Sequence, residues 1–220
     1  MPFQRCSAPI FARLRLLCVT LMAFLGPNHV SASPLTIVAL GDSLSAGLGL
    51  PQNESFPSVL EKSLKERGWD VRIVNAGVSG DTASGGAERM DWSVADGTSA
   101  VILELGSNDM LRGIDPAITR AAIDRILTRL KDRKIPVLVA GMYASRSLGA
   151  DYVAKFDAIF PELAKAHGAT LYPFFLDGVA QDAGLNQPDG LHPNAAGVRR
   201  IVERMLPTVE SFLKMVQTRG

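Results

Sequence analysis

Five short apolar runs alternate along the chain with longer segments in which apolar residues recur every three or four positions. Nearly all residues of the runs are hydrophobic, as in strands that are covered on both faces. The runs are Leu35–Leu40, Val71–Asn75, Ala100–Leu105, Pro136–Gly141 and Ala169–Phe174. Because strands that alternate with helices form parallel sheets, the pattern predicts an α/β fold with a central five-stranded parallel sheet.

The longer segments have the periodicity of amphipathic helices. In the first of them Val59, Leu60 and Leu64 share one face and charged residues lie opposite. The predicted helices are Phe56–Arg67, Pro116–Lys131, Tyr152–His167 and Ala195–Met215. The sequence contains no repeat, low-complexity tract or interdomain linker, so residues 33–220 are predicted to form a single domain.

Residues 1–32 have the features of an export signal. Arginines precede the apolar run Leu16–Leu25, and small residues at Val30-Ser31-Ala32 predict cleavage after Ala32. The run falls well short of the roughly 20 residues that span a bilayer, although an uncleaved anchor is the alternative. We therefore expect an exported protein, periplasmic or secreted, with no stable membrane insertion after cleavage.

Removing this segment changes the charge and the cysteine content. The chain has 23 basic and 22 acidic side chains, and the leader takes three arginines but no acid, which leaves 20 basic against 22 acidic. A slightly negative chain lacks the basic surface that binds nucleic acid or anionic membranes, so no nucleic-acid partner is expected. Cys6 and Cys18 both lie in the leader, which predicts a mature chain without disulfides. We expect this mature chain to be a monomer.

Polar, glycine-rich segments follow the predicted strands. Residues 41–49, 77–86 and 106–113 follow the first three strands, and a loop with Asp189 and His192 follows the fifth. In an open parallel sheet, ligands bind outside the carboxyl ends of the strands. The sequence therefore predicts that these loops meet at one edge of the sheet and form the functional site there.

Two of these loops contain the residue types needed for nucleophilic acyl transfer. Ser43 lies in Gly41-Asp42-Ser43-Leu44, and Asp189 precedes His192 by three positions. A serine hydroxyl becomes a good nucleophile when a base takes its proton, and a carboxylate fixes the tautomer of that base. Ser43 could instead cap a helix, and Asp189 could belong to an ordinary turn. His167 precedes a glycine at a predicted helix end, where a cation favours the helix dipole, so His192 is the preferred base.

The other two loops offer donors for an oxyanion. Gly80 can bring its backbone N–H close to a substrate because it has no side chain, and Asn108 has a side-chain amide. The backbone N–H of Ser43 is the third candidate. Each signal is weak alone, since a glycine or an asparagine is common in turns, but both residues follow neighbouring predicted strands.

Together the four blocks resemble the SGNH (GDSL-type) hydrolases, which are named for a serine, a glycine, an asparagine and a histidine. In this chain those positions are Ser43, Gly80, Asn108 and His192, and Asp189 completes the triad. The resemblance implies a flavodoxin-like three-layer α/β/α sandwich, no metal, no cofactor and a mobile loop after the second strand.

The runs 75–82 and 104–113 look like the branch of periplasmic acyl-CoA thioesterase I, lysophospholipase and arylesterase enzymes. The substrate implied is therefore a small-molecule carboxylic ester or thioester. In that branch the residue after Asn-Asp is often small, whereas here it is Met110, which we expect to close the acyl groove and favour short acyl or aryl esters. The predicted wall of the groove is Val78, Met110, Leu111, Met142 and Tyr143.

Other classes of function fit the sequence less well. The chain has no Gly-x-Ser-x-Gly run, which disfavours an α/β-hydrolase. Of its three histidines, His29 lies in the leader, and the two that remain, without any cysteine, disfavour a zinc enzyme. A carbohydrate O-deacetylase of the same family remains an alternative, but aromatics are only 6% of the chain and Trp69 and Trp92 are its two tryptophans. A non-catalytic periplasmic small-ligand binding protein is the alternative from another class, and it would not need a base beside a nucleophile.

Overall fold

The computed structural model describes residues 1–3 and 34–218 of the chain. The export signal predicted over residues 1–32 therefore lies outside the described residues, apart from the first three. Residues 34–218 belong to one compact unit. No helix in this described part combines the length and the apolar character needed to cross a membrane.

The core of the fold is a five-stranded parallel sheet in the order β2-β1-β3-β4-β5. Ile37 of the first strand in the chain pairs with Ile73 on one side and with Ala100 on the other. The strands are β1 (Leu35–Gly41), β2 (Val71–Gly77), β3 (Ala100–Glu104), β4 (Val137–Ala140) and β5 (Thr170–Tyr172). The predicted α/β class and all five predicted strands are confirmed, with ends that differ by at most two residues.

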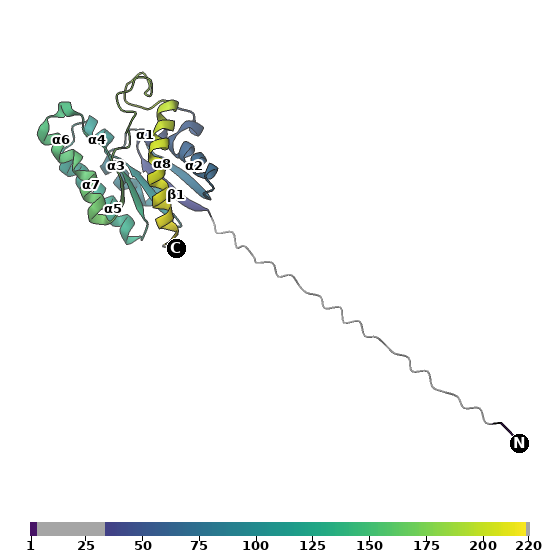
Figure 1. The fold of residues 1–220 in the computed structure, drawn as a ribbon. Coiled ribbons are helices and arrows are strands. Elements are labelled where there is room, and N and C mark those ends of the chain that lie inside the picture. The colour runs from purple at the N-terminus through teal and green to yellow at the C-terminus, as the bar shows by residue number, and fades with distance from the viewer. Residues whose placement is uncertain (4–33, 219–220) are drawn as a thin grey trace. The chain divides into compact units, whose positions relative to one another are not determined.

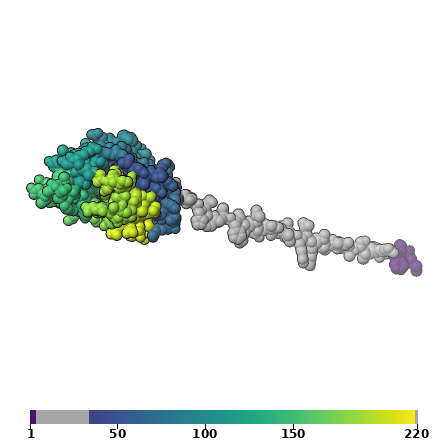
Figure 2. Space-filling model, turned by 90° about the horizontal axis from the view of Figure 1, so that it is seen from above, coloured from purple at the N-terminus to yellow at the C-terminus, as the bar shows by residue number. Residues whose placement is uncertain are grey.

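Helices cover both faces of the sheet (Figure 1). On one face α2 (Phe56–Glu66) packs against α8 (Ala195–Gln217), and the yellow α8 also lies against the blue part of the chain in Figure 2. On the other face α5 (Pro116–Asp132) packs between α3 (Ala83–Ser93) and α7 (Ile159–His167). The predicted three-layer sandwich is therefore confirmed. Shorter helices are α1 (Ser43–Ala46), α4 (Ser107–Leu111) and α6 (Ala150–Asp157), with 3-10 turns at Gln52–Glu54 and Arg146–Leu148.

The apolar pattern along the chain corresponds to burial in the structure. Ile37 and Leu40 of β1 and Ile102 of β3 are at most 1% exposed, and Leu60 and Leu64 of α2 are fully buried in the same core. Burying one such side chain contributes about 1.5–3 kcal/mol relative to leaving it in water. This packing fixes the strand ends, and with them the loops that follow.

Two elements differ from the sequence expectation. Residues 83–93 form α3, although Gly85 and Gly86 each lower helix propensity by about 1 kcal/mol relative to alanine. Thr82 compensates at the start of this helix, since its Oγ1 accepts a hydrogen bond from the Gly85 N–H at 3.2 Å. The predicted helix Tyr152–His167 is two helices that break at Ala158, because Pro161 has no N–H to continue the hydrogen-bond ladder.

Candidate active site

Ser43 follows β1, the second strand in the sheet order, at the carboxyl edge of the sheet. β1 ends at Gly41, and Asp42 caps the one-turn helix α1, its Oδ1 accepting the Leu44 N–H at 2.9 Å. A Cβ at Gly41 would lie 2.2 Å from the Ser45 Oγ and 2.6 Å from the Glu104 Oε2. Glycine is therefore required at position 41 by close packing beneath the turn.

The loop before α8 brings His192 to Ser43 across 149 positions of sequence. The Nε2 of His192 lies 2.9 Å from the Ser43 Oγ, and its Nδ1 lies 2.6 Å from the Asp189 Oδ2. The Asp189 Oδ1 accepts the backbone N–H groups of His192 and Leu191 at 3.0 and 2.9 Å. These backbone donations, with the imidazole, lower the pKa of Asp189 to about 2. The carboxylate thus stays ionised beside the imidazole through the neutral range.

A glutamine that sequence reasoning missed connects the histidine loop to the serine loop. The Nε2 of Gln187 donates to the Leu48 carbonyl at 2.7 Å and to the Pro193 carbonyl at 3.0 Å. Asn194 then caps α8, its Oδ1 accepting the N–H groups of Ala196 and Gly197. These contacts hold the chain rigid on both sides of His192. Only the position of Asn194 before a helical pattern could have signalled such a role in advance.

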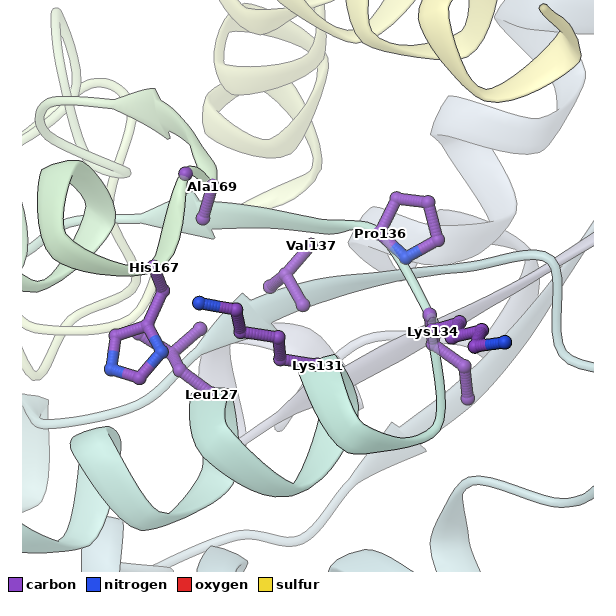
Figure 3. Close-up of a pocket in the computed structure, with 9 residues that line it drawn as sticks. Leu127, Lys131, Lys134, Pro136, Val137, His167 and Ala169 are labelled. Atoms are coloured by element: carbon purple, nitrogen blue, oxygen red, sulfur yellow. The ribbon is translucent and has the colours of Figure 1, made fainter. Parts of the chain in front are cut away.

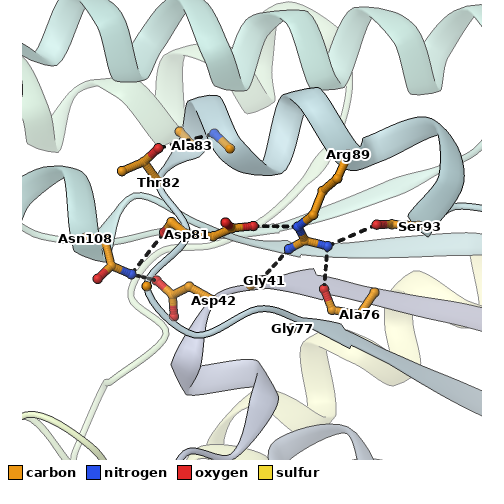
Figure 4. A network of polar contacts seen from close by, with 12 residues as sticks. Gly41, Asp42, Ala76, Gly77, Asp81, Thr82, Ala83, Arg89, Ser93 and Asn108 are labelled. Atoms are coloured by element: carbon orange, nitrogen blue, oxygen red, sulfur yellow. Dashed lines mark hydrogen bonds and ion pairs between the residues drawn. The ribbon is translucent and has the colours of Figure 1, made fainter.

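The loop after β2 and the start of α4 meet at Asp42, where Figure 4 shows Asp81 and Asn108 close to the residue that precedes Ser43. Gly80 has a φ of +86°, and its carbonyl accepts from the Arg112 Nη2 at 2.7 Å. The Nδ2 of Asn108 donates to the Asp42 Oδ2 and to the Asp81 carbonyl, both at 3.0 Å. In the described part of the chain the backbone N–H groups of Ser43 and Gly80 donate to no other protein group. Two of the three predicted donors are therefore unoccupied, and the third, the Asn108 amide, is occupied.

The aspartate after Asn108 has a structural role. Asp109 is fully buried, its Oδ2 accepts the Ala83 N–H at 2.8 Å and its Oδ1 accepts the Thr119 hydroxyl at 3.0 Å. It therefore joins the starts of α3 and α5 to α4. This contact fixes Asn108, its neighbour in the sequence, without touching the serine turn.

Two carboxyl groups lie buried beneath Ser43. Asp42 and Glu104 are both 0% exposed, and the Glu104 Oε2 accepts the Ser45 hydroxyl at 2.7 Å and the Asp42 N–H at 3.3 Å. Burial raises the pKa of Asp42 against the hydrogen bonds from Ser107, Leu44 and Asn108 that lower it. Burial and the charge of Asp42 raise the pKa of Glu104 well above its usual range. Sequence reasoning missed this pair, because the apolar strand pattern conceals Glu104.

The residues expected to wall an acyl groove divide into exposed and buried sets. Val78, Leu111 and Tyr143 are 40%, 53% and 41% exposed. Met110 is half-buried against the core, and Met142 is only 3% exposed and belongs to the core. Met142 therefore offers almost no surface to a ligand. Leu191, which sequence reasoning did not include, is 50% exposed directly beside His192 in the chain.

The remaining candidates lie away from this edge. Trp92 is in the last turn of α3, and Trp69 precedes the amino end of β2 and donates to Glu210 at 3.4 Å, so neither tryptophan flanks Ser43. The Nε2 of His167, in the last turn of α7, lies 2.6 Å from the Asp124 Oδ1. Among the described residues no cluster of histidine, cysteine and carboxylate side chains fits a metal ion.

A cavity of about 450 Å³ lies at the opposite edge of the sheet (Figure 3). It opens beside the amino ends of β4 and β5, between α5 and the end of α7. Its lining residues are Leu127, Lys131, Lys134, Ile135, Pro136, Val137, His167, Gly168 and Ala169. Ser43 lies at the carboxyl edge of the sheet and is 7% exposed.

Comparisons with known proteins agree with the resemblance drawn from the four blocks. Residues 39–200 match the GDSL-like Lipase/Acylhydrolase family. The chain is 36% identical over 183 residues to Esterase TesA of Pseudomonas aeruginosa, which covers 83% of this chain and 91% of that protein. It is 34% identical over 165 residues to Thioesterase 1/protease 1/lysophospholipase L1 of Escherichia coli strain K12, covering 74% and 78%. The crystal structure of AlinE4, a SGNH-hydrolase family esterase, has a TM-score of 0.70 at 44% identity and covers 82% of this chain and 97% of that one.

Proposed function

We propose a catalytic mechanism from the premise that this chain belongs to the GDSL-like lipase/acylhydrolase family. In it the chain hydrolyses esters with Ser43 as nucleophile, His192 as general base and Asp189 as the carboxylate that orients the base. The enzyme class follows from the family: the chain is a serine hydrolase that acts on carboxylic esters or thioesters. The assignment of roles to residues rests on one observation. Ser43, His192 and Asp189 form a continuous chain of contacts of 2.9 and 2.6 Å.

The chemistry proceeds through an acyl-enzyme. The Ser43 Oγ transfers its proton to the His192 Nε2 and bonds to the acyl carbon, so that the carbonyl oxygen becomes an oxyanion. When the tetrahedral intermediate collapses, the bond to the alcohol or thiol breaks and that leaving group takes the proton from His192. A water molecule then loses a proton to His192 and attacks the acyl carbon, which releases the acid and restores Ser43.

The oxyanion is stabilised in this proposal by three donors. The backbone N–H groups of Ser43 and Gly80 are available for it, and losing one such donor typically costs about 10²–10³ in kcat. Asn108 supplies the third, but both of its amide protons point at protein acceptors, the Asp42 Oδ2 and the Asp81 carbonyl. Asn108 must therefore share a proton with the oxyanion or release one acceptor when the substrate arrives.

The acyl or aryl group of the substrate is proposed to lie on the exposed apolar side chains around Ser43. Val78, Leu111 and Tyr143 provide this surface, and Leu191 extends it on the histidine side. Because Met110 is half-buried and packs against the core, we propose that it limits the length of the acyl group and that short acyl and aryl esters are the preferred substrates. The positions of Trp69 and Trp92 offer no aromatic platform for a sugar at this edge.

The export of the enzyme is a separate proposal that rests on the sequence of residues 1–32. We propose cleavage after Ala32 and a periplasmic or secreted mature monomer. N-terminal sequencing of the protein recovered from periplasm and medium should read from Ser33. Full-length protein in the membrane fraction would instead support the uncleaved anchor.

The catalytic proposal is tested with p-nitrophenyl acetate and purified enzyme. Ser43→Ala should abolish turnover, and Ser211→Ala, which changes an exposed serine on α8, should leave it unchanged. Losses from Ser43→Ala and His192→Ala should not add in the double variant, because members of a triad act as a unit. Wild-type turnover in Ser43→Ala, or additive losses, would contradict the assignment.

A further inference from the structure

A buried arginine on α3 contacts three segments of the active-site edge (Figure 4). Arg89 is 7% exposed, and its guanidinium donates to the Gly41 carbonyl at 2.8 Å, the Ala76 carbonyl at 2.8 Å and the Asp81 Oδ2 at 2.5 Å. A further bond at 3.0 Å to the Ser93 hydroxyl keeps the fork in place. All three nitrogens of the guanidinium therefore have protein acceptors.

The three acceptors lie close in the sequence to the residues that are proposed to form the oxyanion site. Gly41 ends the strand that leads into Asp42 and Ser43, and Ala76 lies near the end of the strand that leads to Gly80. Asp81 is the residue that directly follows Gly80. One side chain thus fixes the ends of β1 and β2 and the loop with the glycine donor relative to one another.

The same arginine also acts on Asn108 indirectly, through Asp81. The Asp81 carboxylate is paired with Arg89, and the Asp81 carbonyl accepts one amide proton of Asn108 at 3.0 Å. The other proton goes to Asp42, which follows the carbonyl of Gly41 that Arg89 holds. The guanidinium therefore connects the serine turn, the Gly80 loop and the anchor of Asn108.

A residue at this place needs a planar fork of donors. A buried cation is tolerated where it is paired and hydrogen-bonded, and arginine offers five N–H donors in a fixed geometry. Lysine has a single nitrogen and cannot reach two carbonyls and a carboxylate in the same directions. The position therefore distinguishes arginine from lysine, although the two carry the same charge.

We propose that Arg89 is a positioning residue for ester hydrolysis, which sets the Gly80 N–H and the Asn108 amide at the distance from Ser43 that the oxyanion requires. This inference rests on the proposed function of Ser43. Arg89 touches neither Ser43 nor His192 among the contacts of the described residues, so it does not act on the proton transfer itself. A displacement of about 1 Å in such donors can cost about 10²-fold in rate.

The test compares Arg89→Met and Arg89→Lys with Arg133→Met. Arg133 also holds α3, through the Val94 carbonyl at 2.7 Å, but at the end of the helix that is remote from the serine. We expect kcat for p-nitrophenyl acetate to fall by roughly ten- to a hundredfold in Arg89→Met, and by less in Arg89→Lys. KM should stay within about twofold, and the midpoint of the acidic limb of the pH–rate profile should not move, because His192 and Asp189 keep their contacts.

A purely structural role would give a different result. If Arg89 only stabilised the fold, all folded variants would show the wild-type kcat, with losses confined to the temperature of unfolding. A kcat for folded Arg89→Met within twofold of Arg133→Met would overturn the proposal. If Arg89→Met does not fold, a wild-type kcat in folded Arg89→Lys overturns it equally. Wild-type turnover that does not depend on Ser43 in the same assay would overturn the proposed function itself.

Discussion

Replacing Glu104 by glutamine should remove part of the loss of folding stability that the wild-type protein undergoes as pH rises. The side chain is fully buried, its Oε1 has no hydrogen-bond partner, and its Oε2 accepts from Ser45 and from the Asp42 N–H. Glutamine has nearly the same shape as the protonated acid, and its carbonyl oxygen can accept both bonds. The variant is therefore a permanent version of the neutral form that burial and the charge of Asp42 favour.

The size of the effect follows from proton linkage. The pKa of Glu104 is raised well above the value of 4.5 that the unfolded chain is expected to have. Above about pH 4.5 the unfolded state releases this proton while the folded state keeps it, so the folded state binds more protons and loses stability as pH rises. The slope is up to about 1.4 kcal/mol per pH unit, until the pKa of the folded protein is reached. Glutamine has no proton to lose, so Glu104→Gln lacks this decline.

Urea unfolding at pH 5, 6, 7 and 8 measures this difference. We expect the stability of Glu104→Gln to rise relative to the wild type across the series, by up to about 1.4 kcal/mol per unit. Glu162→Gln is the matched control, because Glu162 is exposed and pairs with Arg120 at the surface. The free energy of unfolding of Glu162→Gln, plotted against pH, should run parallel to that of the wild type. Parallel curves for Glu104→Gln as well, or a relative loss of stability with rising pH, would refute the reasoning.

Three further predictions concern the same edge of the sheet. Met110→Gly should shift the optimum of kcat/KM over p-nitrophenyl esters of two to about sixteen carbons toward longer chains, since each newly buried methylene is worth about 0.8 kcal/mol; identical profiles, or a wild-type optimum at about twelve carbons or more, would contradict the assigned groove. Asp189→Asn should lower kcat by up to about 10⁴-fold, because an amide favours the wrong imidazole tautomer, and the acidic limb of the wild-type profile should lie well above the pKa of about 2 of Asp189; a kcat near the wild type would argue against its role. Gly41→Ala should destabilise the protein by about 1–3 kcal/mol in urea unfolding, since its Cβ would lie 2.2 Å from the Ser45 Oγ; an unchanged midpoint would show that the turn adapts freely.

The sheet was predictable because its strands are covered on both faces. Runs such as Leu35–Leu40, in which Thr36 is the one polar residue, are typical of strands that are buried on both sides, and Ile37, Ala39 and Leu40 are 0% exposed. The helix α3 was hidden because two glycines weaken its local propensity. Its stability comes from the Thr82 cap, from Arg89 and from buried Met90, which are partly contacts with other segments.

The active site was predictable only in part, because some of its contacts depend on tertiary packing, as those of α3 do. Placement of residues after parallel strands predicted that Ser43, Gly80, Asn108 and His192 would share an edge, and the structure has contacts among Ser43, His192 and Asp189. The hydrogen bonds of Arg89 to two backbone carbonyls depend on tertiary packing, and no spacing of residues in the sequence predicts them. Met142 was expected in the groove because it follows a strand, whereas its side chain turns inward and is 3% exposed.

The central claim, that Ser43 is the nucleophile that forms the acyl-enzyme, is tested most directly by mapping a covalent adduct. Wild-type enzyme is treated with a fluorophosphonate, digested, and sequenced by tandem mass spectrometry. We predict one phosphonyl group on the Ser43 hydroxyl, loss of p-nitrophenyl acetate turnover in proportion to labelling, and much slower labelling in His192→Ala. An adduct on a different residue, or active enzyme that is not labelled, would contradict the account, and a folded protein with neither labelling nor turnover would favour a ligand-binding protein instead.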